Sequence, residues 1–266
     1  MSKKTIYASV VVLAALVVFG CGKSKTTVTL AGSTAFQPFA EKLAEQYMQS
    51  HNNVNITVQG GGSAVGIQSA NSGAAQIGMA DMVQLPKEAQ GLTSVIVARD
   101  GVAIVVNPKN PITNLTTDQV RDIFNGKITN WKEVGGNDAP ITVVSREAGS
   151  GTRSSFEQII GNIELKKDAL VQDSNGTIRE TVSNDPNSVS YLSHGLVNEK
   201  VKPLTLDGIQ PTIENIVSGT YKISRPIFLL VKGQIQGEAK NFIDYILSPE
   251  GQKTIKDNGL LPANSK

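Results

Sequence analysis

Apolar and polar residues recur along most of this chain with two different periods. Short apolar or alternating runs that end at glycine or asparagine predict strands, and apolar residues spaced three and four apart predict helices with one buried face. Phe39, Leu43 and Tyr47 follow the second pattern and predict the first long helix, over residues 35–49. Because predicted strands and helices alternate along the chain, the pattern favours an α/β fold with mainly parallel sheets.

The same two rules predict the remaining elements. We expect the long β-rich run over residues 93–107 to be interrupted at Asp100-Gly101. Prolines and asparagines between Asn107 and Pro111 mark the strongest break in the chain, so we predict two α/β lobes. Strands are expected over residues 27–30, 54–59, 76–80, 93–107, 141–144 and 223–232, and further helices over 64–72, 117–124, 238–247 and 249–257.

The first residues have the composition of an export signal. Lys3 and Lys4 precede an apolar run from Ile6 to Phe19, and polar chain follows that run. The run is shorter than the roughly 20 residues that a membrane span needs. A positive start, an apolar middle and small residues at the end are instead typical of a secretory signal peptide.

The end of this segment is typical of the site at which bacterial lipoproteins are cleaved and lipidated. Residues 18–21 read Val-Phe-Gly-Cys, and Cys21 is the single cysteine of the chain, so no intramolecular disulfide can form. We predict a signal peptide over residues 1–20, lipidation of Cys21 and a lipid-anchored tether over 21–26. A plain signal peptide or an uncleaved anchor is the alternative.

The charge balance argues against a nucleic-acid partner. The chain carries 25 basic and 23 acidic residues, and two of the basic ones, Lys3 and Lys4, fall in the signal segment, which leaves 23 of each sign. Nucleic-acid binders normally have a basic excess or a basic stripe. An anion bound by this chain is therefore expected to bind at a local site.

The most specific motif is Ser145–Arg153, which reads Ser-Arg-Glu-Ala-Gly-Ser-Gly-Thr-Arg. It follows the predicted strand over 141–144 and precedes a segment of helical character over 154–160. A strand that runs through Gly-Ser-Gly-Thr into a helix leaves backbone N–H groups unpaired at the helix N-terminus, where the helix dipole favours an anion. Arg146 adds a planar set of donors that suits a tetrahedral oxyanion.

Two earlier turns have the same design. Gly32-Ser33-Thr34-Ala35 follows the first strand, and Gly60-Gly61-Gly62-Ser63 follows the second. Each turn alone is usually an ordinary helix cap, but ligands in open α/β sheets bind beyond the strand ends, where several such turns converge. A P-loop ending and a Gly-x-Gly-x-x-Gly fingerprint are both missing from these turns, so we expect no nucleotide site.

Asp81 ends the third predicted strand and is expected to face the same cleft. An ionised carboxylate can only accept a hydrogen bond, so beside an anion it favours one that carries a proton. Hydrogen phosphate supplies that proton, whereas sulfate would place two acceptors against each other. The alternative is that Asp81 caps a helix or pairs with a surface lysine.

Other conspicuous residues receive structural interpretations. Trp131 is expected in a core or as an anchor of a lobe. His51 and His194 lack a metal-ligand pattern, so no metal and no other cofactor is expected. Arg153 and Arg179 are expected to be solvated or paired on the second lobe.

Together these motifs resemble those of the phosphate-binding solute receptors of the phosphate-specific ABC transporter (PstS-type periplasmic binding proteins). The resemblance covers essentially the whole chain after the signal segment and implies a type II periplasmic binding protein fold. In that fold two α/β lobes are joined by crossover hinge strands, with residues 27–107 and 224–266 in lobe one and 108–223 in lobe two. The matching residues are Gly32-Ser33-Thr34, Gly62-Ser63, Ala80-Asp81 and Arg146-x-x-Gly149-Ser150-Gly151-Thr152, in the family's order.

The resemblance also implies which residues hold the phosphate. Asp81 would accept the phosphate proton, and Arg146 would be the one cationic contact. Ser33 is a secondary candidate, because its side chain can cap the following helix instead. The implied ligands are Thr34, Ala35, Ser63, Asp81, Arg146, Ser150, Gly151 and Thr152.

The sequence departs from the family pattern at one position. Longer family members often carry an aspartate two residues after the arginine, which holds the guanidinium, and here that position is Ala148. Glu147 lies one place earlier, and successive side chains in a turn point in different directions, so we expect Glu147 not to replace it. An arginine with less compensation of its charge would favour the phosphate dianion.

The resemblance implies extracytoplasmic binding of inorganic phosphate and its delivery to an ABC permease with its ATPase, by a monomer that is no enzyme. The enzyme alternative is a phosphatase or phosphotransferase with Ser150 or Thr34 as nucleophile, which would need a base or metals beside it. Two further alternatives are a receptor for another oxyanion on the same fold and a sensory or adhesive receptor.

Overall fold

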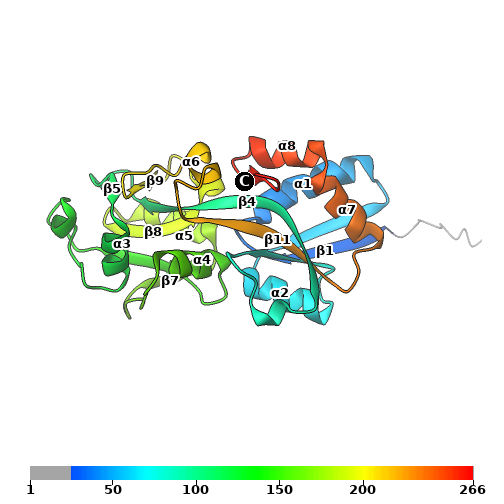
Figure 1. The fold of residues 1–266 in the computed structure, drawn as a ribbon, viewed down its shortest axis with the longest axis horizontal. Coiled ribbons are helices and arrows are strands. Elements are labelled where there is room, and N and C mark those ends of the chain that lie inside the picture. Colours follow the sequence, from blue (N-terminus) through cyan, green and yellow to red (C-terminus); the bar gives the residue numbers. More distant parts are fainter. Residues whose placement is uncertain (1–24, 266) are drawn as a thin grey trace, which may run out of the picture.

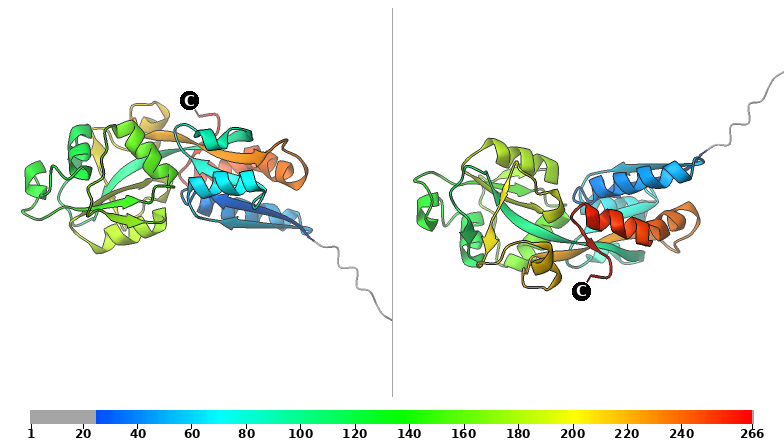
Figure 2. Two further views of the ribbon diagram at one scale, coloured as in Figure 1. Left: turned by 90° about the horizontal axis from the view of Figure 1, so that it is seen from below. Right: turned by 90° about the horizontal axis from the view of Figure 1, so that it is seen from above.

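Helices flank a long mixed sheet in the computed structural model, which describes residues 25–265 (Figure 1). One group of helices and strands packs at each end of the sheet, and Figure 2 shows the two groups side by side in both further views, with β4 and β11 running between them. The predicted signal peptide over 1–20 and the lipidation site Cys21 lie outside the described residues.

The first group forms from the N-terminal βα units together with the end of the chain. Its helices pack against the sheet through apolar faces such as Leu43 and Phe242, which are both fully buried. The elements are β1 (Thr26–Gly32), α1 (Gln37–Ser50), β2 (Val54–Gln59), α2 (Ser63–Ser72), β3 (Ile77–Asp81), η1 (Lys87–Ala89), α7 (Gly237–Leu247), α8 (Pro249–Asp257) and β12 (Leu261–Pro262).

The second group lies between the crossing strands in sequence. Its core contains Phe124, Phe156 and Tyr191, whose rings pack together, and the buried Trp131, as the sequence indicated. The elements are β5 (Asn114–Leu115), α3 (Thr117–Phe124), η2 (Trp131–Val134), β6 (Thr142–Arg146), α4 (Gly151–Ile160), β7 (Leu170–Gln172), α5 (Asn175–Asn184), β8 (Ser188–Ser193), η3 (His194–Leu196), β9 (Lys202–Pro203), β10 (Thr205–Leu206) and α6 (Ile213–Val217).

Two long strands, β4 (Leu92–Val106) and β11 (Ser224–Lys232), connect the groups. The expected interruption of the first of them at Asp100-Gly101 is wrong, because β4 is continuous. Asp100 and Gly101 pair with Arg225 and Ser224 of β11, so the ladder of backbone hydrogen bonds runs through the glycine.

The sheet is mixed, which corrects the prediction of mainly parallel sheets. Within residues 25–265 its main path runs β2-β1-β3-β11-β4-β8-β6-β7. The outer strands are parallel to their neighbours, as βαβ units require, but β11 is antiparallel to β3 and β4, and β4 is antiparallel to β8. Strands β4 and β11 run in opposite directions because β4 carries the chain from the first group to the second and β11 carries it back.

The division of the chain into two lobes remains a prediction. Val97 and Ala98 of β4 pack in the core with α1, whereas Val102 and Ile104 pack in the core with Trp131. The strand therefore changes cores near Gly101, before the predicted boundary at residue 107.

Within residues 25–265, none of the helices combines the length and the apolar character that a membrane crossing requires.

Candidate functional site

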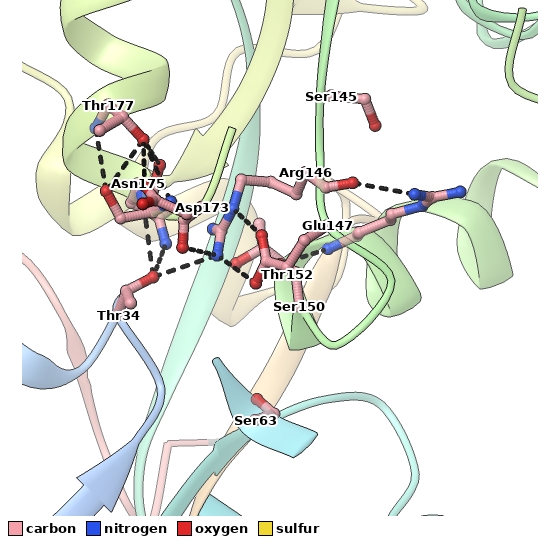
Figure 3. Close-up of polar contacts among 12 residues, drawn as sticks. Thr34, Ser63, Ser145, Arg146, Glu147, Ser150, Thr152, Asp173, Asn175 and Thr177 are labelled. Carbon is pink, nitrogen blue, oxygen red and sulfur yellow. Dashed lines mark hydrogen bonds and ion pairs between the residues drawn. The ribbon is translucent and has the colours of Figure 1, made fainter. Parts of the chain in front are cut away.

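Figure 3 shows residues from the strand-to-helix turns of both groups: Thr34 after β1, Ser63 after β2, Glu147 and Ser150 after β6, and Asp173 after β7. The contacts between them are direct: Arg146 at the end of β6 and Asn175 at the start of α5 both donate hydrogen bonds to Thr34, which follows β1. Ala64 in the first turn of α2 donates its backbone N–H to the carbonyl of Gly149, at 3.0 Å. The predicted turns are thus brought to one place.

Arg146 is the charged centre of this place, and its residue is 1% exposed. Nη2 also lies 3.2 Å from the carbonyl oxygen of Asp173 and 3.3 Å from Thr34 Oγ1. Nη1 is buried and has no hydrogen-bond partner within residues 25–265. A buried guanidinium N–H without a partner costs free energy, so this atom is a natural contact for an anion.

Glu147 holds the guanidinium, which corrects the expectation from Ala148. Its two carboxylate oxygens accept from Arg146 Nε and Nη2, each at 2.9 Å. The backbone of Glu147 is fixed at both ends, because its N–H donates to Gln172 and its carbonyl accepts from Ser150. This bend turns the glutamate side chain back along Arg146, so the guanidinium is compensated and the predicted preference for the dianion loses its basis.

The N-terminus of α4 forms the other half of the motif. Ser150 caps the helix, since its Oγ accepts from the N–H of Arg153 at 3.2 Å, and the helix begins at Gly151, earlier than the sequence predicted. Arg153 donates to the carbonyl of Arg146 and pairs with Glu157, so its charge is used within the second group.

Gly151 lets the two groups approach closely. A Cβ atom at this position would overlap with the carbonyl oxygen of Asp81 and with Ser63 Oγ, both of which belong to the first group. The next residue, Thr152, donates its hydroxyl to Asp81 Oδ2 at 3.2 Å. Glycine is therefore required here by space, whatever its backbone conformation.

The hydroxyl groups of Ser33, Thr34 and Ser63 in the first group have different hydrogen-bond partners. Ser33 Oγ accepts from the N–H of Phe36 at 3.1 Å, so this secondary candidate caps the turn before α1. Thr34 Oγ1 accepts from Arg146 and from Asn175 Nδ2, and the neighbouring Ala35 is buried in the same turn. Ser63 is fully buried and points to Asp81.

Asp81 is buried and paired, which rules out the alternative of a surface lysine partner. Its Oδ1 accepts from Ser63 Oγ at 2.8 Å, and its Oδ2 accepts from Thr152 and lies 2.7 Å from Arg225 Nη2. A carboxylate offers about four lone-pair directions. These three donors leave one direction for a further donor, such as the proton of a bound anion.

The hydroxyl group of Tyr191 holds the end of β6 in place through hydrogen bonds. Its hydroxyl lies 2.8 Å from Ser145 Oγ and accepts from the N–H of Arg146. Burial raises the pKa of Tyr191 to about 12, against the opposing hydrogen bonds, so it is a neutral group that positions the end of the strand.

Asn175, Arg225 and Asp100 were not predicted from the sequence. Asn175 is 1% exposed, and its Oδ1 accepts from the N–H of Ser193, which aims its amide at Thr34. The signal for it was a capping box, Ser174 to Thr177, directly after β7. Arg225 and Asp100 were visible as charges inside otherwise apolar strands.

The part of the chain that the structure describes contains no cluster of three or more histidine, cysteine or acidic side chains that could hold a metal. Thr34 and Ser150 make no hydrogen bond to a histidine among residues 25–265. The arrangement consists of donors around one unpartnered guanidinium nitrogen, with one carboxylate acceptor. Such a set can bind an oxyanion reversibly.

A two-group α/β molecule with helix N-termini meeting between the groups has the architecture of a periplasmic-type solute-binding protein. A model of the PBP superfamily domain matches residues 20–250. The phosphate-binding protein PstS of Bacillus subtilis is 36% identical over 90% of this chain and 82% of its own length, and that of Borreliella burgdorferi is 28% identical over 97% and 98%. The chain belongs to the PstS family of this superfamily.

Solved structures agree with this assignment. A candidate substrate-binding protein of a phosphate ABC transporter from Clostridium perfringens, solved with bound phosphate, has a TM-score of 0.86 and 40% identity, over 89% of this chain and 99% of that one. A phosphate transport receptor from Vibrio cholerae has a TM-score of 0.73 and 40% identity, over 88% and 99%. The α/β fold of a periplasmic binding protein, which the resemblance implied, is therefore confirmed, with a mixed sheet in place of mainly parallel ones.

Proposed function

We propose that this chain binds inorganic phosphate, as hydrogen phosphate, between its two groups of elements and delivers it to an ABC importer. The observation that carries the proposal is the buried Arg146, whose Nη1 has no partner within residues 25–265. Its guanidinium contacts Thr34, which precedes α1, and Asp173, which precedes α5. An anion at that point would receive a charge-assisted hydrogen bond and the favourable ends of the helix dipoles.

The remaining predicted ligands have matching roles in this proposal. From the first group, Thr34 donates its hydroxyl, and Ala35 and Ser63 donate their backbone N–H groups. From the start of α4, Ser150 donates its hydroxyl, and Gly151 and Thr152 donate their backbone N–H groups. Asp81 accepts the proton of the anion in its remaining lone-pair direction. Asn175, which shares Thr34 with Arg146, joins them as an additional polar contact.

Related proteins support the phosphate assignment. Relatives that this chain matches over most of their length are phosphate-binding proteins, and one similar structure contains bound phosphate. The proposed setting is an exported protein, anchored by lipidated Cys21, that works as a monomer with a membrane permease and its ATPase. The signal pattern that ends at Cys21 supports the export and the anchor, and the kinship with phosphate-binding proteins of transporters supports the role in an ABC importer. Binding without bond cleavage, and hence no enzymatic activity, is part of the proposal.

Calorimetry with phosphate, arsenate, sulfate and molybdate tests the proposal on the purified protein. Phosphate and arsenate carry a proton near neutral pH and are expected to bind, whereas sulfate and molybdate are expected to fail. Sulfate binding as tight as phosphate binding would overturn the role of Asp81. Turnover of a chromogenic phosphate ester that disappears in Ser150→Ala would instead favour the phosphatase alternative.

A further inference from the structure

A second buried arginine lies beneath the candidate site, on the strands that join the two groups. Arg225 is 1% exposed, and its Nη2 lies 2.7 Å from Asp81 Oδ2 and 3.0 Å from Asp100 Oδ2. The three residues belong to β11, β3 and β4, which are neighbours in the sheet. One guanidinium thus serves two buried carboxyls, and one of these carboxyls belongs to the candidate site.

The charges of this cluster are not equivalent. Arginine keeps its proton in proteins, so Arg225 is a permanent buried cation. Burial raises the pKa of the Asp100 carboxyl, although Arg225 acts in the opposite direction. Asp100 therefore takes up a proton more readily than an ordinary aspartate, and a neutral Asp100 leaves the charge of Arg225 to Asp81.

We propose that Arg225 is a specificity-determining residue, because it is the counter-ion that keeps Asp81 ionised and therefore able only to accept a hydrogen bond. An ionised Asp81 admits an oxyanion that brings its own proton and repels one that brings none. This inference rests on the proposed function, since it requires the bound anion to meet Asp81. Arg225 acts through Asp81 and is a positioning residue with respect to the anion.

Removal of the guanidinium should change the choice of anion. Asp81 would then be buried without its counter-ion, and burial without a cation disfavours the charged form of a carboxyl. A protonated Asp81 has an O–H group that can donate to sulfate. The site would accept an unprotonated anion that it otherwise rejects.

A direct contact between Arg225 and the anion is the competing role. Its Nε and Nη1 have no hydrogen-bond partner within residues 25–265, so the guanidinium has donors to offer. A direct contact would strengthen the binding of phosphate and sulfate alike, because both present acceptor oxygens. The ratio of the two affinities therefore separates the two roles, and so does not depend on how far a variant weakens binding overall.

The test is calorimetry of phosphate and sulfate at one near-neutral pH, for the wild type, Arg225→Met, Arg225→Lys and the matched control Asp100→Asn. We expect the phosphate-to-sulfate affinity ratio to fall at least about tenfold in Arg225→Met, the effect of relieving one unsatisfied buried acceptor. Arg225→Lys keeps the cation and is expected to keep the ratio. Asp100→Asn keeps the pair of Arg225 with Asp81 and is expected to do the same.

Arg225→Met leaves two uncompensated carboxyls and can fail to fold, so the double variant Arg225→Met with Asp100→Asn repeats the test with one charge of each sign removed. Asparagine at position 100 cannot hold a proton in place of Asp81, so the fall in the ratio is expected to be at least as large in the double variant. An unchanged ratio in a folded methionine variant, or an equal loss of both anions, overturns the inference while the proposed function stands. A wild type that binds no phosphate overturns the proposed function, and this inference with it.

Discussion

Two arginines are buried within residues 25–265, and their charges are compensated in opposite ways. Arg146 is paired with Glu147, its neighbour in the chain, which lies in a turn and has a side chain that is 29% exposed. Arg225 is paired with Asp81 and Asp100, which come from neighbouring strands and are almost fully buried. Both guanidinium groups retain nitrogen atoms without a partner within residues 25–265, so an unpartnered atom alone does not separate them.

The surroundings separate them. Arg146 lies where helix N-termini from both groups meet, in reach of a ligand, whereas Arg225 lies among strands that join the groups. Glu147 lies in a turn and leaves Arg146 available to an anion. Asp81 and Asp100 lie on strands of the sheet and hold Arg225 in place between those strands. Asp81 belongs to both environments, because Thr152 from the Arg146 side also donates to it.

The largest expected effect comes from the first arginine. Arg146→Gln removes the cationic contact and is expected to weaken phosphate binding by about 2–5 kcal/mol, or roughly 30-fold to several thousandfold, as for other buried charge pairs. Calorimetry on the folded variant measures this loss.

Two further variants sharpen the result. Arg146→Gln combined with Glu147→Gln restores the local charge balance, so a loss that persists there belongs to the missing donors and not to an unpaired glutamate. Arg121→Gln, at a partly exposed arginine of α3, is the matched control and should leave binding intact. Phosphate binding of wild-type strength in Arg146→Gln would contradict the assignment of the site.

A smaller loss of phosphate affinity is expected from Gly151→Ala, which would move the start of α4 away from Asp81. The methyl group of Gly151→Ala would overlap with the backbone of Asp81 and with Ser63, so the groups cannot approach as they do in the structure. Overpacking of this kind costs roughly 1–3 kcal/mol, which corresponds to about a 5- to 150-fold loss of phosphate affinity.

Gly176→Ala is the matched control for this variant. Gly176 also lies in the first turn of a helix, α5, but its nearest neighbour to an added Cβ is Ser174 Oγ at 3.7 Å, an ordinary contact. Calorimetry should find phosphate affinity close to that of the wild type for this control. Equal affinities for Gly151→Ala and Gly176→Ala would mean that the approach of Gly151 to Asp81 is not needed for binding.

Local signals in the sequence were enough for many elements. Helix α3 begins and ends where it was predicted, because Thr116 and Gln119 form a capping box before an apolar face. Strand β2 also has its predicted bounds, since its alternating residues are followed by glycines. Strand direction was not predictable in this way, because periodicity within one strand carries no information about its neighbour, and the sheet proved mixed.

The site was predictable where its residues follow strands and unpredictable where they depend on distant contacts. The turns at Thr34, Ser63 and Arg146 could be read locally, and the structure brings them together. The link between Arg146 and Glu147 could not, because the bend is fixed by a hydrogen bond to Gln172 on another strand. The partner of Asp81 could not either, since Arg225 lies far along the chain.

The smallest expected effect on binding comes from Asp100→Asn. This variant tests the surroundings of Arg225 through the thermal stability of the protein. Burial raises the pKa of Asp100 in the folded protein, so its protonated form stabilises the fold below the ordinary aspartate pKa, and this contribution is lost as the pH rises. Asparagine at position 100 does not titrate, so only the wild type loses this contribution as the pH rises. The melting temperature of Asp100→Asn minus that of the wild type should therefore increase between pH 3.5 and 7. A contribution of ~1 kcal/mol corresponds to an increase of about 2–4 °C. Asp244→Asn, at an exposed aspartate of α7, should show no such trend. A difference in melting temperature that shrinks as the pH rises would contradict the raised pKa of Asp100. Phosphate affinity of the variant should stay close to that of the wild type, because Arg225 keeps its pair with Asp81.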